Sequence, residues 1–157
     1  MKTTTNRTLA TPVVANPPIE APSSPYSRIV RASAIYDVLV TFPFALPGLA
    51  AWNISQIIAL HDSLALTGST PHFAPFHLFF VNLMGSIVMI WSALRIYKPE
   101  PLFGLFDGIA RMLFSSWMLY YLLVHNVSGV LWFFIVPESI WGVVQLYGYR
   151  AGRREAI

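Results

Sequence analysis

Long apolar runs separated by short polar stretches dominate the sequence from residue 33 onward. Each run reaches or exceeds the roughly 20 residues that an α-helix needs to cross the hydrocarbon core of a bilayer. Because the runs are continuous and do not alternate every second residue, they do not fit the strands of a membrane β-barrel. The pattern predicts an all-α polytopic membrane protein with four transmembrane helices in an up-down bundle. The predicted spans cover about 33–60, 77–97, 103–124 and 129–149.

The first apolar run is interrupted by the sequence "FPFALPG". Pro43 and Pro47 each lack an amide donor, and Gly48 adds conformational freedom to the backbone, so we expect a kink at this point. Water is absent from the bilayer core, so the carbonyl groups that the kink frees need partners inside the protein.

The chain before the first apolar run is rich in Thr, Pro and Ser and has no sustained periodicity. Such a segment cannot bury enough apolar surface to offset the entropy lost on ordering. We predict a disordered cytoplasmic tail over residues 1–28, a four-helix transmembrane domain over 29–150, and a basic cytoplasmic C-terminus over 151–157.

The composition supports a membrane environment. Of the 157 residues, 55% are hydrophobic and 11% are charged, whereas roughly 25% are charged in an average soluble domain. The sequence contains no cysteine, which excludes disulfides and thiolate metal sites. The formal net charge is +3, but the basic residues flank apolar segments and do not form one patch with interleaved aromatic residues. This arrangement argues against a nucleic-acid partner.

The positions of the basic residues predict the orientation of the chain in the membrane. With four spans, every Lys and Arg falls on the same side, and the loops near 61–76 and 125–128 carry none. The positive-inside rule then places both termini and the 98–102 connection on the cytoplasmic side of the cell (inner) membrane. The basic residues are Lys2, Arg7, Arg28, Arg31, Arg95, Lys98, Arg111, Arg150, Arg153 and Arg154.

The fourth apolar run, "LWFFIVPESIWGVVQLYGYR", contains a carboxylate near its middle. At 1.5 Å per helical residue, Glu138 lies ~13 Å from the outer boundary of the membrane. A charge that faces lipid there costs ~3 kcal/mol or more, so Glu138 should point into the bundle and be paired or protonated. We predict that Glu138 is a candidate acid or base in a polar intramembrane pocket. The other predicted pocket residues are Asn53, Asn82, Ser86, Ser115 and Trp141.

The third apolar run contains the only basic residue that lies well inside a predicted span. Asp107 precedes Arg111 by four residues, so the two side chains share a helix face and can form an ion pair at the cytoplasmic boundary. The alternative is that Arg111 reaches toward Glu138, ~6 Å away in depth.

All four histidines lie in or beside the two outer loops. If the helix ends converge, neutral imidazoles can hold Zn, Cu or a haem iron. The alternative is that these side chains are amphipathic anchors at the membrane boundary, since their spacing matches no metal motif. The residues of this candidate metal site are His61, His72, His77 and His125.

The middle of the chain resembles a known group of membrane proteins. The loop "TGSTPHFAPFH" leads into "LFFVNLMGSIVMIWSALR", and an Asp and an Arg follow early in the next helix. This layout, over about residues 61–111, resembles the small four-helix bacterial membrane proteins of the DoxX-like and BphX-like groups. The resemblance implies an inner-membrane protein, sometimes encoded beside redox or aromatic-degradation enzymes. It carries no functional residue over to this chain.

Three functions remain open from the sequence. The first is a non-enzymatic protein that binds a lipophilic molecule or serves as an accessory subunit of a membrane complex. The second is a proton-linked small-molecule transporter, working as an oligomer because four helices rarely enclose a pathway. The third is a membrane enzyme that uses Glu138 as general acid on an isoprenoid or quinone-like substrate. The sequence identifies no cofactor, and it leaves open whether the protein is an enzyme.

Overall fold

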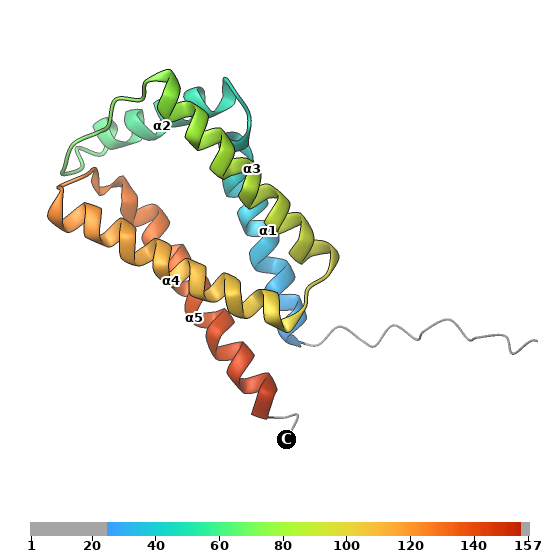
Figure 1. Cartoon of the computed structure of the whole chain (residues 1–157). Helices are drawn as coiled ribbons and strands as arrows, with labels where there is room; N and C mark the ends of the chain where they lie inside the picture. The colour runs from blue at the N-terminus through green and yellow to red at the C-terminus, as the bar shows by residue number, and fades with distance from the viewer. Residues whose placement is uncertain (1–24, 155–157) are drawn as a thin grey trace, which may run out of the picture.

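The computed structural model of the chain describes residues 25–154 (Figure 1). The predicted tail therefore lies outside the described residues except for residues 25–28, which belong to the first helix. Residues 151–154 of the predicted C-terminus belong to the last helix. The described part of the chain is all-helical and contains no strand, apart from a single bridge between Ser69 and Val127. Its helices are α1 (Pro25–Ala45), α2 (Leu49–Ser63), α3 (Pro75–Tyr97), α4 (Pro101–Val124), the short 3-10 helix η1 (Gly129–Leu131) and α5 (Trp132–Arg154).

The first predicted span is broken into two helices. The kink expected at "FPFALPG" is present as a bend of 105° between α1 and α2. Gly48 adopts φ 80° there, a left-handed conformation that residues with a Cβ avoid. The amide of Asn82 on α3 donates a hydrogen bond of 2.9 Å to the carbonyl of Phe44. Asn82 thus satisfies a carbonyl group that the end of α1 leaves without a helical partner.

The remaining predicted spans agree with the helices to within a few residues. Pro75 and Pro101 occupy the first turns of α3 and α4, where a missing amide donor costs nothing. Among the described residues, α3, α4 and the 129–152 segment are each long and apolar enough to cross a membrane, and α1 with α2 counts as a fourth span if the bent pair is one. These apolar helices indicate a membrane protein.

The helices form two hairpin-like pairs arranged as the sides of a triangle (Figure 1). Helix α1 packs along α3, and α4 packs along α5. The two pairs converge where α1 and α4 begin and diverge toward the other end, where α2 lies across the opening. The backbones of α3 and α4 have no extensive contact. The predicted up-down four-helix bundle is therefore not confirmed, because the two pairs diverge toward the end where α2 lies.

Backbone hydrogen bonds close the third side of this triangle. The loop after α2 meets the turn between α4 and α5, where the amide of Ser69 donates to the carbonyl of Asn126 at 2.9 Å. The amide of Gly129 donates to the carbonyl of Thr67 at 2.8 Å. These bonds tie the α2 end of the molecule to the α4–α5 turn.

The crossing of α1 and α3 depends on a residue without a side chain. A Cβ added to Gly85 would lie 2.7 Å from the backbone nitrogen of Ala45. Backbone atoms cannot move aside as the end of a flexible side chain can. We expect Gly85→Ala to lower the free energy of unfolding by about 1–3 kcal/mol, the usual cost of overpacking.

A neighbouring residue provides the control for Gly85→Ala. Ser86 is exposed on the same helix, so Ser86→Ala should leave the free energy of unfolding nearly unchanged. Both variants can be compared with the parent protein by SDS titration in mixed micelles. Equal stability of the two variants would show that α1 and α3 do not cross as closely at Gly85 as the structure shows.

Candidate functional site

A cluster of charged side chains lies where the four long helices converge. α1 contributes one acid, α3 one base, α4 an acid and a base, and α5 one acid, and their side chains are between 0% and 19% exposed. Buried charges in a membrane protein require partners, since an isolated charge is costly in a low-dielectric environment. We refer to these residues as the charged cluster: Asp37, Arg95, Asp107, Arg111 and Glu138.

Arg111 joins all three carboxylates of the charged cluster. Its Nε donates to Asp107 at 2.9 Å, which is the predicted ion pair four residues apart on one helix. Its Nη2 donates to Asp37 at 2.6 Å, and its Nη1 donates to Oε2 of Glu138 at 2.8 Å. Both arrangements weighed from the sequence for Arg111 therefore occur in the same side chain.

Arg95 supplies the second guanidinium and is fully buried. Its Nη1 donates to Oδ2 of Asp107 at 2.5 Å, and its Nη2 forms an ion pair with Asp37. The hydroxyl groups of Ser33 and Ser92 each accept a further hydrogen bond from Arg95 at 3.2 Å. The guanidinium also lies 5.6 Å from the ring centroid of Trp91. Helices α1, α3 and α4 are thus connected through one side chain.

Neutral polar groups add hydrogen bonds around the charged cluster. The indole of Trp91 donates to Oδ1 of Asp107 at 2.9 Å. The amide of Gln145 on α5, which is fully buried, donates to Ser33 at 2.6 Å. The Trp91 bond uses an oxygen of Asp107 that the ion pairs leave free. Nε of Arg95 and Oε1 of Gln145 have no hydrogen-bond partner among the described residues.

The formal charges of the cluster do not balance. Three carboxylates face two guanidiniums, which leaves a net charge of −1 when all five groups are ionised. Each of the aspartates contacts both arginines, whereas Glu138 contacts only Arg111. The uncompensated negative charge therefore lies at the Glu138 edge of the cluster.

Comparisons with known proteins do not assign this arrangement to a family. No protein-family model, curated protein or solved structure matches the chain. The residues and their geometry alone carry the functional interpretation.

The residues predicted to line a polar pocket with Glu138 are not brought together as one group. Ser115 lies buried one turn beyond Arg111, and Trp141 packs on Tyr36 with ring centroids 6.0 Å apart. The side-chain amide of Asn82 donates a hydrogen bond to the carbonyl of Phe44. Asn53 is half-buried on α2, and Ser86 is exposed on α3. Ser115 is therefore the predicted pocket residue that shares a buried helix face with the charged cluster.

The four histidines have separate surroundings. Nδ1 of His61 lies 2.7 Å from the hydroxyl of Ser128, and Nδ1 of His77 accepts a hydrogen bond from the backbone of Ala74 at 3.1 Å. His72 is exposed, and His125 ends α4 against two tyrosine rings. No group of three or more His, Cys, Asp or Glu side chains that could hold a metal ion occurs within residues 25–154. Within this part of the chain the structure therefore gives no support to the metal hypothesis.

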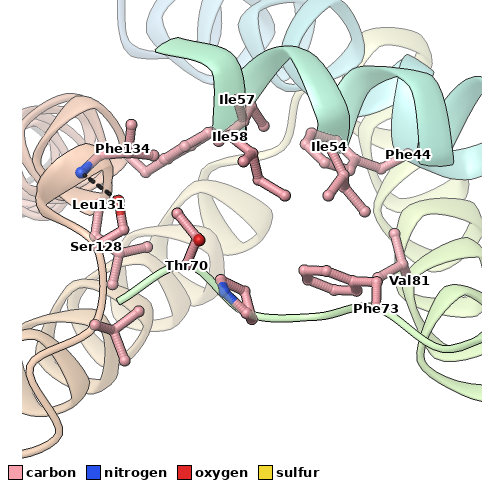
Figure 2. Close-up of a pocket in the computed structure, with 13 residues that line it drawn as sticks. Phe44, Ile54, Ile57, Ile58, Thr70, Phe73, Val81, Ser128, Leu131 and Phe134 are labelled. Carbon is pink, nitrogen blue, oxygen red and sulfur yellow. Dashed lines mark hydrogen bonds between the residues drawn. The ribbon is translucent and has the colours of Figure 1, made fainter. Parts of the chain in front are cut away.

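An apolar cavity of about 250 Å³ lies beneath α2. Figure 2 shows Ile54, Ile57 and Ile58 extending from α2 toward the loop that carries Thr70 and Phe73. Thr70 and Ser128 are the only lining residues with a polar side chain. The full lining consists of Phe44, Ile54, Ile57, Ile58, Thr70, Pro71, Phe73, Val81, Val127, Ser128, Val130, Leu131 and Phe134.

Two helices lead from the cavity to the charged cluster. On α5, Glu138 follows the cavity residue Phe134 by four positions, so the two side chains share a face ~6 Å apart along the axis. On α1, Asp37 precedes the cavity residue Phe44 by seven positions, again on the same face. The helices that carry Glu138 and Asp37 therefore also contribute Phe134 and Phe44 to the cavity lining.

Sequence reasoning missed several members of the site. Asp37 and Arg95 were not singled out, and neither were the neutral partners Ser33, Ser92 and Gln145. Asp37 carried a usable signal, since it is an acid inside a predicted span, as Glu138 is. Arg95 lies within three residues of the end of its predicted span, which is also where basic residues anchor helices at the membrane boundary.

Proposed function

We propose that this protein is a small integral membrane protein that binds a lipophilic molecule in the apolar cavity beneath α2. The observation that carries the proposal is the cavity itself, lined almost entirely by aliphatic and aromatic side chains. Ligand sites typically combine such a lining with a few polar groups that orient the ligand. Thr70, Ser128 and the nearby Glu138 supply polar groups of this kind.

The size of the cavity limits what it accommodates. Its volume of about 250 Å³ lies just below the roughly 300–1,000 Å³ of typical small-molecule sites. A single ring or the end of an aliphatic chain fits this space, and the rest of a larger ligand would extend past the helices. An isoprenoid, a fatty chain or a small aromatic compound meets these requirements.

The proposed location is the inner membrane, with both termini in the cytoplasm. The support is the one-sided distribution of Lys and Arg along the chain under the positive-inside rule. A relationship to the DoxX-like and BphX-like groups stays a prediction that rests on the layout of residues 61–111. A role as an accessory subunit or in a homo-oligomer stays a prediction as well.

The transporter and enzyme alternatives both depend on proton exchange at Glu138. Oε2 of Glu138 is joined to Arg111 at 2.8 Å, whereas its other oxygen has no ion pair. The apolar cavity favours the binding function over both, because binding a lipophilic molecule requires an apolar site and no proton exchange.

Filling the cavity tests the proposal. Ile58 lines the cavity from α2, and Ile58→Trp would place an indole in the space where the ligand lies. We expect the amount of co-purifying molecule to fall strongly, because the indole takes up space that the ligand would fill. Native mass spectrometry of gently solubilised protein, with extraction and identification of co-purifying molecules, measures the occupancy.

The control introduces the same indole on the outside of the same helix. Leu60 is exposed, so Leu60→Trp should retain the co-purifying molecule at the parental level. A parental protein that is free of any lipophilic molecule, and that takes none up when offered, would contradict the proposed function.

A further inference from the structure

We propose that the bound molecule is a lipophilic amine whose protonated ammonium group binds at Glu138 while its apolar part occupies the cavity. The inference rests on the proposed function and adds the chemical class of the ligand. It follows from the position of the uncompensated charge, from the exposure of Glu138, and from a buried hydroxyl group without a partner.

The distribution of ion pairs places the excess charge on one residue. Asp37 pairs with both arginines, and Asp107 pairs with both and also accepts a hydrogen bond from Trp91. Glu138 has a single ion pair, formed by its Oε2 with Arg111. Its second oxygen is available to one more donor, and a positive charge beside it would bring the net charge of the cluster to zero.

Glu138 is also the most accessible carboxylate of the charged cluster. Its side chain is 19% exposed, against 10% for Asp37 and 6% for Asp107. The accessible carboxylate is the one that lies a single helical turn from the cavity residue Phe134. We therefore place the contact between a molecule in the cavity and the charged cluster at Glu138.

Ser115 provides an independent sign of a missing polar partner. Its hydroxyl is buried and has no hydrogen-bond partner among the described residues. Ser115 follows Arg111 by one turn on the buried face of α4, on the side toward the α4–α5 turn that borders the cavity. A buried hydroxyl without a partner is unfavourable, and an ammonium group with three N–H donors can satisfy it together with Glu138.

The order of the apolar and charged parts of the site along the membrane normal argues for a free amine and against a bilayer phospholipid. The apolar cavity is lined by residues of α2 and of the α4–α5 turn, and Glu138 lies further along α5 from that turn. A phospholipid has the reverse order, with its headgroup at the helix ends and its chains at the centre of the membrane. A lipophilic amine that enters between the diverging helix pairs can bind with its charged end deeper than its apolar part.

Three probes of equal chain length test the charge preference. Decylamine, decanol and decanoate share the apolar part and carry a positive, neutral or negative head at neutral pH. Binding to the full-length protein in nanodiscs is measured by titration calorimetry, with empty nanodiscs subtracted. We expect decylamine to bind about tenfold or more tightly than decanol, in line with charge pairs in partly buried sites, and decanoate to bind most weakly.

Three variants link the preference to Glu138. Glu138→Gln should bring the affinities of decylamine and decanol to within about twofold, since it removes the charge and keeps the shape. Glu138→Asp keeps the charge and should retain most of the preference. Asp62→Asn, which removes an exposed carboxylate on α2, should leave the preference unchanged and so controls for surface charge.

The outcomes separate this inference from the proposed function. If the parental protein binds decylamine and decanol equally and Ile58→Trp binds neither, the proposed preference for an amine is wrong. Binding of a lipophilic molecule in the cavity is then still supported. Absence of binding for all three probes would contradict both. An unchanged preference in Glu138→Gln would also overturn the inference. If Glu138→Gln does not fold, the order of the three affinities in the parental protein decides the question.

Discussion

Replacing Arg111 by methionine is expected to cost about 3–5 kcal/mol of folding free energy, the range measured when one partner of a buried ion pair is removed. Arg111 is the only side chain of the charged cluster that contacts all three carboxylates. Without it, three carboxylates face Arg95 alone, and the formal charge of the cluster changes from −1 to −2. Methionine fills much of the volume but neutralises none of this charge.

The expected loss can be separated from a general effect of removing a cation. Arg150 is exposed near the end of α5, so Arg150→Met should change stability by no more than about 0.5 kcal/mol. The free energies of unfolding are compared by SDS titration. If Arg111→Met and Arg150→Met unfold at the same SDS fraction, the ion pairs at Arg111 contribute nothing to folding.

A double variant tests whether the net charge causes the instability. Adding Glu138→Gln to Arg111→Met removes one of the three carboxylates and returns the formal charge to −1. We expect it to recover part of the loss, because the two positions are in direct contact and their effects are not additive. Purely additive losses would point to packing as the cause.

The membrane-spanning helices could be predicted from the sequence because their signal is local. An apolar run of about 20 residues has few alternatives to a helix in lipid, where every backbone group needs an internal partner. The break near Gly48 was also predictable, since Pro43 and Pro47 remove amide donors at known positions. The direction of α2 after this break could not be predicted from the sequence. Proline and glycine permit a bend, but its angle of 105° depends on tertiary contacts such as the Asn82 bond to Phe44.

Residue spacing along the sequence predicts some of the contacts of Arg111. Its pair with Asp107 follows from the four-residue interval on one helix. Its contact with Glu138 was weighed as an alternative to that pair, and the structure contains both. The two are compatible because a guanidinium carries five N–H donors in a planar fork and can serve several carboxylates at once.

The ion pair between Arg95 and Asp37 could not be predicted from residue spacing. An arginine close to the end of an apolar helix can extend to the membrane surface or turn inward, and both are consistent with the same sequence. The choice depends on the rotation of α3 about its axis, which is set by packing against α1. The ion pair between Arg95 and Asp37 joins residues 58 positions apart, so no local pattern predicts it.

Comparing Arg95→Met with Asp37→Asn separates the number of ion pairs from the net charge. Each parental side chain forms two ion pairs within the charged cluster. Removing Arg95 changes the formal charge from −1 to −2, whereas removing the charge of Asp37 changes it to zero. We therefore expect Arg95→Met to cost about 3–5 kcal/mol.

Asp37→Asn should cost less, about 1–3 kcal/mol, because the amide oxygen still accepts from the guanidiniums and the remaining charges balance. The measurement is the free energy of unfolding by SDS titration for both variants in the same micelles. Equal losses would show that the cluster is stabilised by its contacts irrespective of charge, and the excess negative charge at Glu138 would then lose its energetic significance. A larger loss for Arg95→Met would mean that buried negative charge without a matching positive charge destabilises the folded protein. A bound ammonium group would reduce that cost by supplying the missing positive charge.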